Sequence, residues 1–142
     1  MRITNVLKNK GDRVVTIDPD EPVSALLDLL AEHGVGALVV SVDGETIEGI
    51  VSERDVVRGL QTDGAAMLGH SVRSIMTAEV HTCEPSAAID DLMRLMTERR
   101  FRHVPVVVDG RLRGIVSIGD VVKHRIDELQ SERDQLTAYI SS

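Results

Sequence analysis

The chain has 142 residues, of which 42% are apolar and only Phe101 and Tyr139 are aromatic. Sixteen Lys and Arg residues against 23 Asp and Glu residues give a formal net charge of −7. Because base-stacking surfaces need several exposed rings and phosphate-binding surfaces are usually basic, this composition excludes nucleic-acid polymers as partners.

The first half of the chain predicts a strand, a helix, two strands and a second helix, in that order. Runs of β-branched residues bounded by Pro or Asp-Gly predict strands, and apolar residues three and four apart predict helices. The predicted elements are strands at 14–17, 37–42 and 47–51, a helix at 23–33 and a helix that opens at Ser52.

A glycine-containing segment, 59–72, separates this half from the next, and residues 65–68 within it predict one helical turn. The same order of elements then returns. The predicted elements are strands at 80–83, 104–108 and 112–116, a helix at 89–99 and a helix that opens at Ser117.

The two halves are copies of one another. Residues 14–44 and 80–110 are identical at ten of 31 positions, and GIVSERDVV (49–57) matches GIVSIGDVV (114–122) at seven of nine. Two copies are too few for a solenoid, so we expect a pseudo-twofold pair. We divide the chain into a first repeat (1–58), a linker (59–72), a second repeat (73–124) and a C-terminal amphipathic helix (125–142).

The C-terminal helix carries apolar residues in alternating steps of three and four, the spacing of a coiled-coil seam. The seam comprises Ile126, Leu129, Leu136 and Ile140, with Arg133 interrupting it. Two interpretations follow: the helix packs on its own repeat, which we favour, or it pairs with a second protomer.

The motifs GIVSERD and GIVSIGD, preceded by ALVVSVDG and FRHVPVV, resemble those of the CBS domain family, and the tandem pair resembles a Bateman module. The resemblance covers nearly the whole chain. It implies an α+β fold in which two βαββα units pack pseudo-symmetrically and enclose two clefts. It also implies a regulatory, non-catalytic role, with clefts that hold AMP, ADP, ATP, NAD(H) or S-adenosylmethionine.

The repeated G-x-x-S-x-x-D motif has two interpretations that do not exclude each other. Ser52 with Asp55, and Ser117 with Asp120, can form capping boxes that need no ligand. In the second interpretation the helix N-terminus and the Ser hydroxyl bind phosphate, and the Asp carboxylate accepts hydrogen bonds from ribose hydroxyls. We expect ligand binding in at least one cleft.

The copies differ where the resemblance implies phosphate contacts. Arg102 and His103 in the second copy replace Gly36 and Ala37 of the first, so we expect the second-copy cleft to bind anions better. Arg54 and Arg58 offer partial compensation in the first. The resemblance further implies that each cleft is completed by the segment before the other repeat, around 8–14 or 77–80. The second-copy candidates are Arg102, His103, Val104, Pro105, Ser117, Asp120 and Val14, and the first-copy candidates are Gly36, Ala37, Ser52, Asp55, Thr77 and Val80.

For two further residues we expect a role in packing rather than in ligand binding or reactivity. Phe101 is expected in the core rather than against a base, so the adenine would rest on aliphatic side chains and backbone groups. Cys83 ends an apolar strand, where a thiol is usually inert. As a single cysteine it cannot form an internal disulfide, which suits a reducing compartment.

We therefore expect a regulatory module that binds an adenine nucleotide or other adenosyl ligand, with or without Mg²⁺, as an effector and not as a catalytic cofactor. It would act in trans on an unidentified protein, and we expect a homodimer. The alternative is a ligand-free scaffold in which the motifs serve only as helix caps. No metal site or catalytic residue is predicted. The chain lacks an apolar membrane span and a secretory leader, so we expect a cytoplasmic protein.

Overall fold

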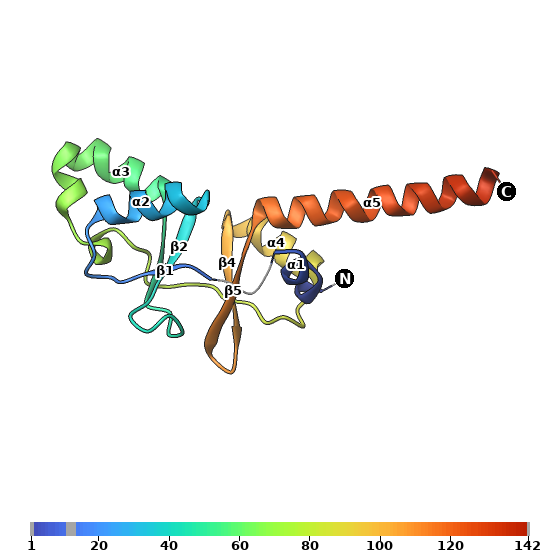
Figure 1. The fold of residues 1–142 in the computed structure, drawn as a ribbon, viewed down its shortest axis with the longest axis horizontal. Helices are drawn as coiled ribbons and strands as arrows, with labels where there is room; N and C mark the ends of the chain where they lie inside the picture. The colour runs from blue at the N-terminus through green and yellow to red at the C-terminus, as the bar shows by residue number, and fades with distance from the viewer. Residues whose placement is uncertain (1, 11–13, 142) are drawn as a thin grey trace.

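A computed structural model describes residues 2–10 and 14–141 of the chain, and the two repeats form two α/β units that lie side by side (Figure 1). In the first unit, strand β1 is parallel to β2 and β2 is antiparallel to β3, which gives the sheet order β1-β2-β3. The elements are β1 (Thr16–Ile17), α2 (Val23–His33), β2 (Ala37–Val40), β3 (Gly49–Ser52) and α3 (Glu53–Asp63).

The second unit repeats this plan around an antiparallel pair, β4 and β5. Its elements are α4 (Ile89–Arg99), β4 (His103–Val108), β5 (Arg111–Ser117) and α5 (Ile118–Ser141). The strand predicted at 80–83 is wrong in extent, since only Cys83 pairs, in parallel, with Val106. The strand predicted at 14–17 is likewise reduced to the two residues of β1.

The strand registers preserve the duplication. Ile17 pairs in parallel with Val40 in the first unit, and Cys83 pairs in parallel with Val106 in the second. Each residue of the second pair lies 66 positions after its counterpart in the first pair. The backbone of Cys83 donates to the Pro105 carbonyl at 3.0 Å and accepts from the Val107 N–H at 2.8 Å. The mixed α and β fold predicted from the repeated motifs is therefore confirmed.

Each unit has its own apolar core, and each core is completed by the segment that precedes the other repeat. Ile3 and Val6, on helix α1 (Ile3–Lys10), are buried with the second-repeat residues Ile89 and Val116. In return, Val72 is buried in the first-repeat core. Helix α1 is absent from the predicted elements, and it packs in the core of the second repeat.

The segment between the repeats is more structured than a linker. Helix α3 runs on to Asp63 and is followed by two 3₁₀ helices, η1 (Gly64–Gly69) and η2 (Val72–Ser74). The turn predicted at 65–68 is thus confirmed within η1. A β-carbon on Gly59 would lie 2.1 Å from the Met67 methyl carbon, so glycine lets α3 pass directly over this buried side chain.

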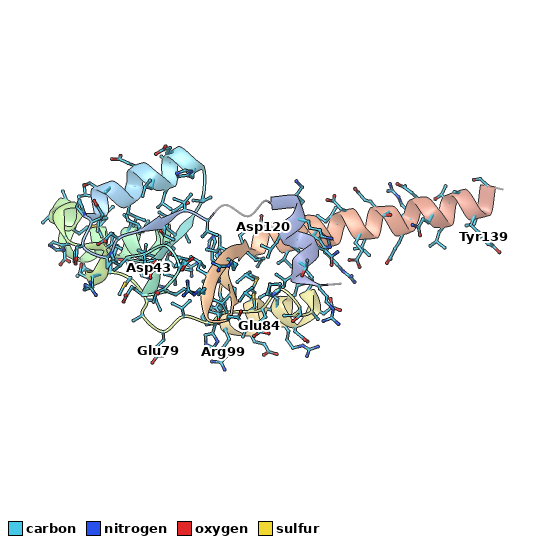
Figure 2. All side chains as sticks on the ribbon, turned by 60° about the horizontal axis from the view of Figure 1, so that its bottom comes forward. Asp43, Glu79, Glu84, Arg99, Asp120 and Tyr139 are labelled. Carbon is cyan, nitrogen blue, oxygen red and sulfur yellow. The ribbon has the colours of Figure 1, made fainter. Side chains whose placement is uncertain are left out.

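Helix α5 leaves the second unit and extends away from it, with Tyr139 near its far end (Figures 1 and 2). Only Val121 near its start is buried, and every residue from 131 to 141 is exposed. The favoured expectation, a C-terminal helix that packs on its own repeat, is therefore wrong beyond the first turns. Among the described residues no helix combines the length and apolarity needed to cross a membrane.

Candidate functional site

A cleft of about 860 Å³ lies between the two repeats. Its first-repeat wall is formed by the end of β3 and the first turns of α3, and its second-repeat wall by the segment that joins α4 to β4. The lining residues central to its chemistry are Gly36, Ala37, Ile50, Ser52, Glu53, Arg54, Asp55, Arg58, Thr77, Arg99, Arg100, Phe101, Arg102 and His103.

The first-repeat motif opens α3 at the wall of this cleft. The Asp55 carboxylate accepts a hydrogen bond from the Ser52 N–H at 2.8 Å and one from the Ser52 hydroxyl at 3.2 Å, both through Oδ2. This capping arrangement pairs the Ser52 N–H at the start of the helix without a ligand. It also fixes the orientation of the Asp55 carboxylate beside the cleft.

Thr77 reaches this cleft through a backbone pair with the first-repeat sheet. Ile50 and Thr77 exchange two N–H to carbonyl hydrogen bonds of 2.9 Å each. A β-carbon on Gly49 would lie only 2.7 Å from the Thr77 carbonyl oxygen, so glycine permits this approach. The expected contribution of the segment before the second repeat is thus observed for Thr77, whereas half-buried Val80 does not line the cleft.

Arg102 and His103 lie in the lining together with Ser52 and Asp55. Their backbone nonetheless belongs to the second repeat, since His103 is in register with Ser117 and the Ile118 N–H donates to the Arg102 carbonyl at 2.8 Å. Arg102 and His103, which the sequence predicts for the second-copy cleft, thus line the cleft that contains Ser52 and Asp55. The sequence groups them with Ser117 and Asp120 because a repeat alignment does not show which neighbouring wall a residue faces.

Gly36 lies between the start of α3 and His103 of the second repeat. A β-carbon at this position would lie 3.1 Å from Glu53 Oε1 and 3.7 Å from the His103 Cε1 atom. The Gly36 carbonyl also accepts the Glu53 N–H at 3.0 Å, which joins β2 to the start of α3. The tight contact would thus be with Glu53 of the same repeat, whereas 3.7 Å to His103 is an ordinary van der Waals distance.

The second-repeat motif forms a complete capping box at the start of α5. The Ser117 hydroxyl accepts the Asp120 N–H at 3.0 Å, and the Asp120 carboxylate accepts the Ser117 N–H at 2.9 Å. Val104 and Pro105 are buried in β4, and Val14 is half-buried. The segment expected to complete this cleft, 8–14, includes residues 11–13, which lie outside the described part of the chain.

Among the lining residues that the sequence analysis did not identify are two arginines. Arg99 and Arg100, at the end of α4, line the cleft beside Arg102. The signal that could have identified them is the run RRFRH (99–103), which directly follows the predicted helix. Phe101, within this run, lines the cleft and also packs against the second core, with its ring centroid 4.8 Å from that of His81.

The cleft is electropositive within an acidic protein. Five arginines and His103 line it together with only two carboxylates, Glu53 and Asp55, whereas the whole chain carries a net charge of −7. No group of three or more His, Cys, Asp or Glu side chains that could hold a metal ion occurs among residues 2–10 and 14–141. The arrangement is suited to binding an anion through guanidinium groups.

Cys83 lies apart from these residues and is suited to packing rather than chemistry. Burial raises the pKa of its thiol to about 11, because the charged thiolate is poorly solvated there. Its Sγ lies 3.7 Å from the Pro105 carbonyl oxygen. The thiol is thus almost entirely protonated at neutral pH, and a nucleophilic thiolate is disfavoured.

Comparison with known proteins identifies the family. The sequence matches the CBS domain family twice, at residues 10–62 and 72–127. The chain is a tandem pair of CBS domains. The crystal structure of the CBS-domain protein ATU1752 from Agrobacterium tumefaciens superimposes with a TM-score of 0.85 and 45% identity, covering 88% of this chain and 99% of that one.

Two further relatives of the CBS pair extend the comparison. The mitochondrial CBS domain-containing protein CBSX3 of Arabidopsis thaliana is 37% identical over 97% of this chain and 71% of its own length. A solved structure of CBSX2 in complex with AMP is 30% identical, covers 89% of this chain and 96% of that chain, and gives a TM-score of 0.73.

Proposed function

We propose that this CBS pair is a regulatory module that binds an adenine nucleotide or another adenosyl ligand in the cleft between its repeats. The observation that carries the proposal is the meeting of Ser52 and Asp55 from one repeat with Arg102 and His103 from the other in one lining. Support comes from CBSX2, a relative of the same fold whose structure was solved with AMP.

Each part of an adenine nucleotide has a suitable partner in this cleft. Asp55 bonds Ser52 through Oδ2, and its other carboxylate oxygen can accept from a ribose hydroxyl. Arg102 and His103 offer donors to phosphate. Ile50 and backbone groups offer the base an apolar surface with hydrogen-bonding edges.

A ligand in this cleft would bridge the two repeats and stabilise one relative orientation of them. Glu45 of the first repeat already contacts the second through ion pairs with Arg111 and Arg113 and through its carbonyl, which accepts the Leu112 N–H at 2.8 Å. A bound ligand would add contacts of this kind and shift the population of orientations. An unidentified partner protein would sense that shift in trans.

We also propose that α5 pairs with a second copy of the chain. The seam residues Ile126, Leu129, Leu136 and Ile140 are between 49% and 82% exposed, at the alternating spacing that fits another helix of the same kind. An apolar seam of this length on an isolated helix favours association over solvation. The homodimer would place two ligand-binding pairs in one regulatory unit.

Titration calorimetry tests the proposed function. We expect at least one of AMP, ATP, NADH and S-adenosylmethionine to bind, measured with and without Mg²⁺, and Asp55→Ala and Arg102→Ala to weaken that binding. An Arg94→Gln variant, outside the lining and exposed on α4, is the matched control. Absence of binding below millimolar concentration by all four ligands would contradict the proposal.

The ligand-free scaffold is the competing function, and the two capping boxes favour it. Ser117 and Asp120 satisfy the start of α5, and Ser52 and Asp55 that of α3, with protein groups alone. A scaffold predicts that Ser117→Ala lowers the melting temperature while no nucleotide raises it. Thermal melts with and without each ligand therefore separate the two functions.

A further inference from the structure

The five arginines of the cleft lack partners, in contrast to most arginines elsewhere in the described chain. The side chains of Arg54, Arg58, Arg99, Arg100 and Arg102 make no hydrogen bond or ion pair with another described residue. Outside the cleft, Arg73, Arg111, Arg113, Arg125 and Arg133 are each paired with a carboxylate. Among the described residues, most arginines outside the cleft thus face a carboxylate, whereas the five that line the cleft do not.

The unpaired arginines come from both walls of the cleft. Arg54 and Arg58 are separated by four residues near the start of α3, a spacing that places both on one helix face. Arg99, Arg100 and Arg102 come from the end of α4 and the segment that leads into β4. Relative to Glu53 and Asp55, the lining carries an excess of three positive charges with His103 neutral.

Arg100 occupies a backbone conformation that favours glycine. Its φ is +59°, and it is the C-terminal cap of α4. The corresponding residue of the first repeat, 66 positions earlier, is Gly34, which caps α2 with a φ of +62°. Glycine adopts this left-handed region readily, whereas L side chains do so under strain. The second repeat therefore keeps a strained arginine at the position where the first repeat has an unstrained glycine.

The left-handed cap belongs to the fold of both repeats, but nothing in the packing of the described residues requires an arginine in it. The Arg100 side chain is exposed and makes no polar contact with the described residues. Because it lines the cleft, a bound ligand is the partner that would explain it. A strained residue at a position where glycine would be unstrained is typical of functional positions. A guanidinium at this point adds a fork of donors to a cleft that already holds four others.

We propose that this cleft selects polyphosphorylated adenine nucleotides over monophosphates and over cationic adenosyl ligands, and that Arg100 is a determinant of this selection. The inference rests on the proposed function, because it specifies the ligand class of the same cleft. One phosphate can neutralise only part of the surplus charge, whereas a triphosphate chain can engage arginines of both walls. A sulfonium ligand such as S-adenosylmethionine would add positive charge to an electropositive site.

The test compares AMP, ATP, S-adenosylmethionine and inorganic tripolyphosphate by titration calorimetry at one fixed ionic strength. We expect the wild-type protein to bind ATP at least about tenfold more tightly than AMP, since charged hydrogen bonds contribute on this scale. We expect S-adenosylmethionine to bind more weakly than AMP. Tripolyphosphate distinguishes recognition of a nucleotide from recognition of any polyphosphate.

Arg100→Gly removes the guanidinium and relieves the backbone strain together. We expect it to weaken ATP binding by about tenfold and AMP binding by less than about threefold, while raising the melting temperature of the unliganded protein. Arg100→Ala keeps the strain, so it should weaken ATP binding equally without raising the melting temperature. Asp109→Gly is the matched backbone control, because Asp109 also has a positive φ, of 53°, outside the lining. Arg94→Gln is the matched charge control.

The outcomes separate this inference from the proposed function. Equal affinity for AMP and ATP, or equal weakening of both by Arg100→Gly, overturns the inference and leaves nucleotide binding intact. Tripolyphosphate binding as tightly as ATP overturns selection of a nucleotide. Absence of binding by AMP, ATP and S-adenosylmethionine alike overturns the proposed function and the inference with it.

Discussion

Replacing Gly49 with alanine should push the Thr77 segment away from the first-repeat sheet. The added β-carbon would lie 2.7 Å from the Thr77 carbonyl oxygen and 2.8 Å from the Met76 sulfur. The Thr77 carbonyl oxygen belongs to the backbone, so it can move only if the surrounding chain moves with it. The two Ile50–Thr77 hydrogen bonds of 2.9 Å would weaken as Thr77 moves. Because Thr77 also lines the cleft, the substitution should disturb both stability and binding.

The magnitude follows from overpacking and from the weakened backbone pair. Together they give a loss of about 2 kcal/mol in the free energy of unfolding. For a chain of this size that loss lowers the melting temperature by roughly 8 °C. Urea denaturation measures the free energy, and titration with the tightest-binding ligand measures the effect on the cleft.

Gly114→Ala is the control that the duplication supplies. Gly114 is the equivalent buried glycine of the second repeat, but its added β-carbon would meet the end of the Leu7 side chain at 2.9 Å, which can rotate away. We expect a loss of about 1 kcal/mol and unchanged ligand affinity at the described cleft. Wild-type stability in Gly49→Ala, or a larger loss in Gly114→Ala, would refute the reasoning.

Three more predictions concern other parts of the fold. Ser117→Ala should lower the free energy of unfolding by about 1 kcal/mol in urea denaturation, because the Asp120 N–H loses the Ser117 hydroxyl as its hydrogen-bond acceptor at the helix start. An unchanged urea midpoint would contradict a stabilising role of this cap. Burial raises the pKa of Cys83 from 9.0 to about 11, so iodoacetamide should label it slowly at pH 8 and faster as the pH approaches 11. The neutral thiol's contribution to stability is full below pH 9 and is lost as the pH rises through 11; fast labelling of the folded protein at pH 8 would contradict this. Replacing Leu136 and Ile140 together with glutamate should convert a dimer to a monomer in light scattering without unfolding the repeats, and a wild type that is already monomeric would exclude the α5 pairing.

The elements that depend on local patterns were predictable from the sequence. The helices at 23–33 and 89–99 have the predicted bounds because their apolar residues face a core at helical spacing. The strand before the second of these helices was less predictable. Its sequence favours a strand, but of these residues only Cys83 pairs with another strand. Strand pairing depends on the position of the segment in the folded chain, which the local sequence does not determine.

The composition of the cleft could be predicted only in part. The duplicated Ser and Asp motif identified Ser52 and Asp55, and the resemblance to the CBS family led to Thr77. The sequence groups Arg102 and His103 with Ser117 and Asp120, but both residues also line the cleft with Ser52 and Asp55, because residues whose backbone continues one repeat can line a cavity against its neighbour. The seam of α5 was visible in the sequence, but a heptad pattern does not show whether its partner lies in the same chain.

A crystal structure of the protein grown with AMP tests the central claim most directly. We expect the nucleotide in the cleft between the repeats, with a ribose hydroxyl on Asp55 and the phosphate on at least one of Arg102 and His103. Asp55→Ala crystals grown under the same conditions should show reduced occupancy. Nucleotide bound only outside this cleft, or a cleft that stays empty at saturating AMP and ATP, would contradict the account.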